Sequence, residues 1–183
     1  AQGSGSIILT SSAGSLRANA GAISYSASKA AVNSLAQTAA PRRAVVDTTR
    51  GRIVLELACP QAPMTCLSFL QLAEAGYFDG QSFHRVVPDF VVQGGDPRGD
   101  GWGGPGYALR DEVNRLRFGR GAVGMALSGP DTGGSQFFIA LAPQPHLDGG
   151  YTVFGQVAGD DSVLDQIRQE DELVTIREVE TGE

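Results

Sequence analysis

The sequence predicts a mainly β protein, an all-β barrel or sandwich, that is preceded by a strand and a helix of different character. Many short β-like runs follow one another after residue 43, whereas only two segments of this part have helical spacing. Numerous short strands bury their apolar faces against one another, and barrels and sandwiches are the folds that achieve this. A change of composition near residue 41 separates this main part from the residues before it.

The strand candidates of the main part are divided by turn residues. Residues 44–57 (AVVDTTRGRIVLEL) are expected to form a hairpin that turns around Thr49–Gly51. The last candidate, 173–180 (LVTIREVE), alternates apolar and polar residues as an edge or closing strand does. The candidates between them are SFHRVV (82–87), FVVQGG (90–95), GAVGMAL (121–127), QFFIALA (136–142) and YTVFGQV (151–157).

Two helices are predicted within the main part. Pro63 suits the first turn of a helix, and Gly76 suits its end. A second, shorter helix is expected at about 161–169. The apolar residues that recur at helical spacing in the first helix are Cys66, Leu67, Phe69, Leu70, Leu72 and Ala73.

Charge is distributed unevenly along the chain. Residues 1–46 carry four basic and no acidic side chains, so their net charge is +4. Residues 47–183 carry ten arginines and all twenty acidic side chains, which gives −10 there and −6 for the whole chain. This step predicts an appendage of residues 1–41 and a domain of residues 42–183. The acidic domain has no basic stripe, which argues against nucleic acid or an anionic membrane as a partner.

The two cysteines of the chain, Cys59 and Cys66, lie seven residues apart. Neither has a histidine or another cysteine at the spacing of zinc ligands, so a zinc site is not expected. We interpret them as two small, partly buried thiols in a reducing compartment, which points to the cytoplasm. A disulfide would require an exported protein and suitable geometry.

The appendage is expected to contain a strand at 6–10 (SIILT) and a helix at 27–39, which ends before Pro41. With the loop between them, residues 3–40 resemble one late unit of the short-chain dehydrogenase/reductase family. In that family a serine after the strand and a Tyr-x-x-x-Lys motif at the helix start form the active site. The matching residues are Ser12, Tyr25 and Lys29.

Reductase chemistry needs a nicotinamide cofactor as well as these three side chains. The family binds the cofactor on a glycine-rich turn after the first strand of a parallel sheet, far upstream of this unit. The pattern G-x-G-x-x-G occurs at 99–104 and 119–124, but neither match opens a helix, so both are interpreted as chance matches. The appendage is therefore expected to be non-functional, and no cofactor is expected.

Three motifs of the main part resemble the cyclophilins, which are peptidyl-prolyl cis-trans isomerases. They are FHRVVPDFVVQGGDP (83–97), MALSGPDTGGSQFFIAL (125–141) and HLDGGYTVFG (146–155), and the resemblance spans about residues 43–180. It implies a closed eight-stranded antiparallel barrel capped by two helices. It also implies a substrate groove on the outer face of the barrel, because side chains fill the interior, and catalysis without a cofactor or a metal.

The resemblance also assigns roles to residues. Arg85 matches the donor that favours the pyramidal prolyl nitrogen of the transition state, and it is expected to be catalytic together with Phe90 and Gln93. The residues expected to bind substrate are His84, Val91, Ala126, Leu127, Gln136, Phe138, His146, Leu147 and Tyr151. Among them Val91, Phe138 and Leu147 match walls of the proline pocket, although barrel core is the more common fate of such residue types.

Three positions depart from the usual pattern of the family. Leu127 replaces a common asparagine, so only the backbone groups remain there to pair with a peptide. Tyr151 replaces a histidine and keeps both a ring and a donor. His146 stands where animal cyclophilins often carry a tryptophan that donates to cyclosporin, so cyclosporin binding is expected to be weak at best.

The leading hypothesis is a prolyl isomerase that acts on proline-containing peptides or unfolded polypeptides, assists protein folding and works as a monomer. One alternative is a non-catalytic module that binds proline peptides. Retention of Arg85, Phe90, Gln93, Gln136 and Phe138 disfavours it, since a pure binder does not need the donor. A second alternative is a fragment of an NAD(P)-dependent reductase.

Overall fold

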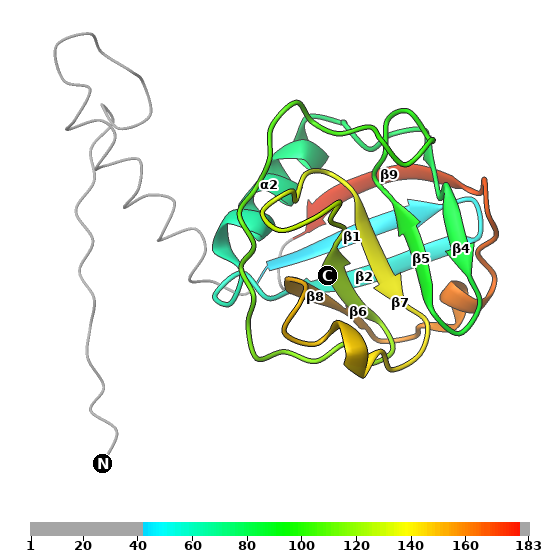
Figure 1. Ribbon diagram of the computed structural model, residues 1–183. Coiled ribbons are helices and arrows are strands. Elements are labelled where there is room, and N and C mark those ends of the chain that lie inside the picture. The colour runs from blue at the N-terminus through cyan, green and yellow to red at the C-terminus, as the bar shows by residue number, and fades with distance from the viewer. Residues whose placement is uncertain (1–41, 180–183) are drawn as a thin grey trace, which may run out of the picture. The chain divides into compact units, whose positions relative to one another are not determined.

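The computed structural model describes residues 42–179, which form one curled antiparallel sheet with a single α-helix beside it (Figure 1). The predicted strand 6–10, the predicted helix 27–39 and the residues Ser12, Tyr25 and Lys29 lie outside the described residues. The elements are β1 (Arg42–Thr48), β2 (Gly51–Leu57), α2 (Pro63–Glu74), β3 (Gln81–Ser82), β4 (Arg85–Val87), β5 (Val91–Gly94), β6 (Ala122–Met125), β7 (Phe137–Ala140), the 3-10 turn η2 (Pro145–Leu147), β8 (Val153–Ala158), the 3-10 turn η3 (Ser162–Asp165) and β9 (Glu172–Val179).

The predicted hairpin is confirmed. β1 and β2 pair in antiparallel register and end opposite each other at Thr48 and Gly51. The hydroxyl of Thr48 donates to the carbonyl oxygen of Gly51 at 2.8 Å and accepts the N–H of Arg50 at 3.1 Å, which closes the turn. Gly51 has a φ of +136°, a conformation that L side chains rarely adopt, so the turn requires glycine.

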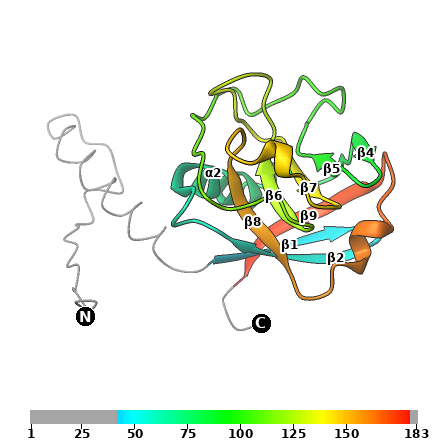
Figure 2. The same cartoon turned by 60° about the horizontal axis from the view of Figure 1, so that its bottom comes forward.

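The sheet order is β3-β9-β1-β2-β8-β6-β7-β5-β4. β3 and β4 are the two ends of this order, yet only Phe83 and His84 separate them along the chain. The curled sheet therefore returns to the stretch at which it begins (Figure 2). The structure counts nine strands instead of the expected eight, because the predicted strand 82–87 is interrupted and pairs with β9 on one side and with β5 on the other.

Side chains of the strands point alternately to the two faces of the sheet, and the apolar ones form a cluster on each face. Val92, Val123 and Phe137 belong to the main core, together with Phe69 and other side chains of α2. Their immediate neighbours in sequence point to the other face of the sheet, because successive side chains of a strand face opposite sides. These neighbours join a second cluster on the outside, whose buried members are Val91, Phe118, Ala122, Phe138, Leu147 and Val153.

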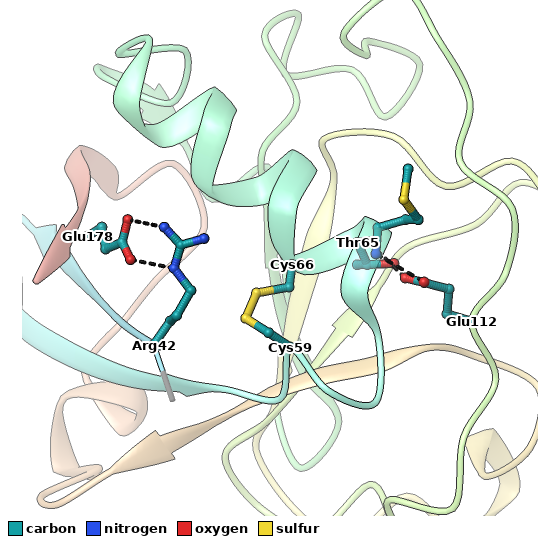
Figure 3. Close-up of a disulfide and its surroundings, with 7 residues drawn as sticks. Arg42, Cys59, Thr65, Cys66, Glu112 and Glu178 are labelled. Atoms are coloured by element: carbon teal, nitrogen blue, oxygen red, sulfur yellow. Dashed lines mark hydrogen bonds and ion pairs between the residues drawn. A yellow bond between two sulfur atoms is a disulfide. The ribbon is translucent and has the colours of Figure 1, made fainter. Parts of the chain in front are cut away.

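The first predicted helix is confirmed as α2, and its N-terminal end is bound by a carboxylate from a distant loop. Glu112 accepts the backbone N–H groups of Met64 at 3.0 Å and Thr65 at 2.7 Å (Figure 3). The first N–H groups of a helix have no partner within the helix, and a carboxylate stabilises that end.

The second predicted helix is shorter than expected, because the segment 161–169 holds only the four-residue 3-10 helix η3. Leu164 within it and Ile167 after it are both buried in the main core. Arg120 binds the side chain of Asp161 at 2.7 Å and that of Asp165 at 3.0 Å, which holds the short turn against the loop before β6.

The interpretation of Cys59 and Cys66 as partly buried thiols is wrong. The structure joins them in a disulfide with a Cα–Cα distance of 5.2 Å, and both residues are fully buried in the main core (Figure 3). After β2 the chain turns at Ala58, whose carbonyl accepts the N–H of Ala62 at 3.1 Å, and it enters α2 immediately afterwards. This turn brings the start of the helix back beside the end of β2. Cys66 therefore lies next to Cys59 although only six residues separate them.

We expect reduction of the disulfide to destabilise the protein. A cross-link that closes so short a loop contributes about 2.5 kcal/mol by restricting the unfolded chain. Heating in the presence of a dithiol reductant should therefore lower Tm by about 5 to 10 °C relative to the oxidised protein. The double variant with alanine at Cys59 and Cys66 serves as the control, because its Tm should not respond to reductant. Equal melting of the wild-type protein with and without reductant would contradict this expectation.

Within residues 42–179, no helix is long and apolar enough to cross a membrane. The same residues contain no cluster of three or more His, Cys, Asp or Glu side chains arranged to hold a metal ion.

Candidate active site

A cavity of about 130 Å³ opens on the outer face of the sheet, above the second apolar cluster. Nine of the twelve residues that the sequence assigns to the site line it. They are Arg85, Phe90, Val91, Gln93, Ala126, Leu127, Phe138, Leu147 and Tyr151. They come from β4, β5, β7, η2 and the segments next to them, which the curl of the sheet brings together.

The floor of the cavity is apolar and closely packed. Val91, Phe138 and Leu147 are buried, with between 2% and 8% of their surface exposed. The ring of Phe118 stacks on Phe138 at 5.4 Å, and Tyr151 meets the Phe138 ring edge-on at 6.0 Å. The floor is therefore a rigid aromatic surface that can accept a small apolar ring.

Arg85 supplies a cation at the rim. It lies on β4 directly opposite Gln93 of β5, and its Nη1 donates to Gln93 Oε1 at 3.2 Å. Its guanidinium lies 5.4 Å from the centroid of the Phe90 ring. No ion pair formed within residues 42–179 includes Arg85, so its other N–H groups remain available to a ligand.

A relay of amide groups orients Gln93. Gln136 donates its NH₂ group to the carbonyl oxygens of Gly101 at 3.0 Å and Gly103 at 2.9 Å. Its own oxygen therefore faces Gln93, whose Nε2 donates to it at 3.0 Å. This leaves the oxygen of Gln93 facing Arg85. Gln136 does not line this cavity and acts on it through Gln93, but it lines the adjoining cavity.

An adjoining cavity of about 240 Å³ shares Gln93, Ala126 and Leu127 with the first one. The glycine-rich loop forms much of its wall, and Trp102 stands there with 78% of its surface exposed. Trp102 is not among the site residues that the motifs predict. Its sequence signal is an aromatic side chain within a glycine-rich loop, where few neighbours can bury it.

Buried Asp96 holds this loop in place. Its carboxylate accepts the N–H of Arg98 at 2.8 Å and the N–H of Gly101 at 2.5 Å. A Cβ atom at Gly103 would lie 1.9 Å from Asp96 Oδ1, so the loop can close around the carboxylate only with glycine at that position. The two carbonyl groups that bind Gln136 are thereby fixed.

The structure does not bring the two histidines of the predicted site into either cavity. His84 lies between β3 and β4 and lines neither cavity, and burial lowers its pKa. His84 Nδ1 is buried without a hydrogen-bond partner among the described residues. His146 is exposed and stacks on the Phe90 ring, with the ring centroids 5.8 Å apart, but it does not line either cavity.

Asp148, which the motifs do not mark as a site residue, binds the backbone of the aromatic floor. Its carboxylate accepts the backbone N–H of Phe118 at 2.9 Å and is paired with Arg117 at 3.0 Å. These donors, the backbone N–H of Phe118 first, lower the pKa of Asp148, so the carboxylate stays ionised in the neutral range.

The arrangement suits a reaction that needs binding and one directional donor. Its lining combines an apolar floor, a guanidinium and an amide, and it includes no carboxylate, cysteine or serine that could act as a base or nucleophile. An apolar ring can enter the floor while Arg85 donates to an oxygen or nitrogen next to the ring.

Comparisons with known proteins match both parts of the chain to families. Residues 43–181 match the model of the cyclophilin type peptidyl-prolyl cis-trans isomerases. Residues 1–53 match the model of the short chain dehydrogenases, so the two matches overlap in β1 and β2.

Individual relatives point to the first of these families. A peptidyl-prolyl cis-trans isomerase of Synechococcus elongatus is 44% identical over 137 residues, which cover 74% of this chain and 94% of that protein. One from Helicobacter pylori is 45% identical and covers 73% of this chain and 84% of its own. A crystal structure of a cyclophilin type isomerase of Cryptosporidium parvum superposes with a TM-score of 0.73 at 32% identity, covering 78% of this chain and 99% of that one. The same protein was crystallised in the presence of the dipeptide Ala-Pro, and that structure gives a TM-score of 0.71.

Proposed function

The chain belongs to the cyclophilin-type peptidyl-prolyl cis-trans isomerases, and from this membership we propose that its outer cavity is where X-Pro peptide bonds rotate. The observation that carries the proposal is the position of Arg85, whose guanidinium forms no ion pair within residues 42–179 and lies at the rim of an apolar recess large enough for a proline ring. Activity then requires neither a nucleophile nor a cofactor.

Rotation is slow because resonance gives the X-Pro bond partial double-bond character, with a barrier of roughly 18–20 kcal/mol. In the twisted state the prolyl nitrogen regains its lone pair and can accept a hydrogen bond. A donor that meets this nitrogen binds the transition state more tightly than the planar ground state, which is what lowers a barrier. Arginine suits the role because it stays charged and carries several N–H groups in a fixed plane.

The other residues of the cavity have supporting roles in this proposal. Phe90, Phe138 and Leu147 enclose the proline ring, while Gln93 holds the guanidinium of Arg85 at the rim. Ala126 donates its N–H to the carbonyl of Gln136 within the protein, whereas no backbone hydrogen bond of Leu127 is formed within residues 42–179. The backbone groups of Leu127 are thus the ones offered to an extended peptide.

Substrates are proposed to be proline-containing peptides and unfolded polypeptides, whose folding the protein would assist. The cavity is open to solvent on the outer face, so a proline within a longer chain can enter it. Residues that flank the proline would reach the adjoining cavity beside Trp102, since the two cavities share Gln93, Ala126 and Leu127.

A protease-coupled assay with a chromogenic X-Pro peptide tests the function. We expect the cis peptide to be consumed faster as the protein concentration rises. Binding of the peptide without acceleration would instead favour the alternative of a non-catalytic proline-peptide module. Saturable binding of NADH or NADPH to the protein in a fluorescence titration would favour the reductase alternative.

We further propose that residues 42–183 form the isomerase domain, and we expect deletion of residues 1–41 to leave kcat/KM within about twofold. All lining residues lie between Arg85 and Tyr151, and every strand of the sheet lies within residues 42–179. Deletion of residues 1–53 is the matched comparison, because it also removes β1 and should unfold the protein by circular dichroism. A loss of activity above tenfold in the shorter deletion would refute the boundary.

A further inference from the structure

We infer that Gln144 is a positioning residue that sets the distance between the two walls of the proline cavity and thereby its selectivity for ring size. This inference rests on the proposed function. Gln144 lies just before η2 and does not line the cavity. Only 7% of its surface is exposed, which is unusual for a polar side chain and calls for a bonding partner.

The partner is the turn that carries Phe90. Gln144 Nε2 donates to the carbonyl oxygen of Asp89 at 2.7 Å, across 55 residues of sequence. Asp89 has a φ of +57°, the left-handed conformation, and Phe90 N donates to Val87 O at 3.1 Å to close the turn. A non-glycine residue in this conformation persists where its surroundings hold it, and the bond from Gln144 is such a restraint.

The backbone of Gln144 is bound to a second part of the lining and to the floor. Its N–H donates to Phe118 O at 2.7 Å, and its carbonyl oxygen accepts the N–H of Leu147 at 3.0 Å. Phe118 stacks on Phe138, and Leu147 lines the cavity together with Phe90. One residue therefore joins the Phe90 wall, the Leu147 wall and the aromatic floor.

Besides the bond that closes its own turn, the backbone of Phe90 has a 2.8 Å bond from Leu141 N to Phe90 O. That bond restrains Phe90 itself, whereas the bond from Gln144 restrains the preceding peptide and so the direction from which the ring enters. Without it, the Phe90 ring can move away from Leu147, and the stacked His146 ring offers no hydrogen bond to prevent this.

Greater freedom of the Phe90 ring should change KM more than kcat. Contact between the ring and the walls exists in the ground state and in the transition state alike, so its loss raises KM and leaves kcat nearly unchanged. The fit to ring size should weaken as well. One additional methylene in a closely fitting apolar pocket changes specificity by about 10- to 200-fold, and a wider gap reduces that discrimination.

The test compares Gln144→Leu with the wild-type protein on two peptides that differ only in the imino acid, proline or the six-membered pipecolic acid. We expect Gln144→Leu to raise KM for the proline peptide about 3- to 10-fold, in line with the loss of one hydrogen bond, with kcat within twofold. The ratio of kcat/KM between the proline and pipecolic peptides should fall at least threefold. If the leucine variant does not fold, Gln144→Met replaces it, because methionine keeps an unbranched side chain without the donor. The same changes of KM and selectivity are expected for it.

Gln156→Leu is the matched control. Gln156 also donates its side-chain amide to a backbone carbonyl, that of Arg120 at 2.9 Å, but it is exposed and does not line the cavity. The control should keep the wild-type KM and ring selectivity. If the Gln144 variants match it in both quantities, or lose kcat and Tm together with unchanged selectivity, the inference is overturned. An inactive wild-type protein would instead refute the proposed function itself.

Discussion

Replacement of Arg85 with alanine is expected to lower kcat/KM for an X-Pro peptide by about 100-fold or more, mainly through kcat. The magnitude follows from mutation of single donors that stabilise a transition state, which costs about 100- to 1,000-fold in kcat. KM should change little, because the apolar walls that hold the proline ring remain in place. Protease-coupled kinetics at several substrate concentrations separate the two parameters.

The fold of this variant should be unaffected. Arg85 is exposed on β4 at the end of the sheet order, and within residues 42–179 its side chain forms one hydrogen bond, the 3.2 Å contact with Gln93. Exposed substitutions of this kind change the free energy of unfolding by less than about 0.5 kcal/mol. A fall in activity with an unchanged Tm therefore reports the chemistry and not the structure.

Two further variants make the result specific. Arg85→Lys keeps the charge but loses the planar fork, so we expect it to recover only part of the activity. Arg110→Ala removes an arginine whose side chain is 92% exposed and which does not line the cavity, so it should behave as wild type. Retention of wild-type kcat in Arg85→Ala would disprove the proposed role of the guanidinium.

Gly124→Ala is expected to damage both the stability of the protein and its substrate binding. Gly124 lies on β6 opposite Phe138 of β7, under two aromatic rings of the cavity floor. A Cβ atom there would lie 2.5 Å from Phe138 Cζ and 2.6 Å from Phe118 Cε1, closer than atoms in contact can approach. The rings must move, and the stacked pair leaves only the open side of the cavity for that movement.

Such overpacking of a closely filled site costs about 1–3 kcal/mol of unfolding free energy. We expect denaturant unfolding to show this loss, and peptide kinetics to show a rise of KM of about tenfold as Phe138 enters the space of the proline ring. Gly119→Ala is the matched control, because a Cβ atom at Gly119 meets nothing within 4 Å. If the two alanine variants had equal stability and equal KM, the packing argument would fail.

Much of the fold could be predicted from local sequence patterns. Alternation and turn residues located the hairpin of β1 and β2, and the spacing of apolar residues from Pro63 located α2. The strand candidates after it correspond to strands of the structure, apart from the division of 82–87 into β3 and β4. These features depend on neighbours within a few residues, which a sequence displays directly.

The predictions for 161–169 and for the two cysteines differ from the structure at points that residue spacing does not display. Within 161–169 only Ser162–Asp165 form a 3-10 helix, and Arg120, from a loop 41 residues before Asp161, binds both Asp161 and Asp165. Cys59 and Cys66 form a disulfide because the turn at Ala58 returns the chain to its own strand end. Spacing along the chain does not display either contact.

Some features of the candidate site could likewise be predicted from the sequence, and others could not. The motifs located most of the cavity in advance: of the twelve residues assigned to the site, nine line it. The motifs do not show which apolar residues face outward, that Gln136 acts through Gln93, that neither histidine lines a cavity, or that Gln144 binds the Phe90 turn. These features depend on the curl of the sheet, which sets which strand faces become neighbours, and on hydrogen bonds between segments up to 55 residues apart, which hold the side chains of the site.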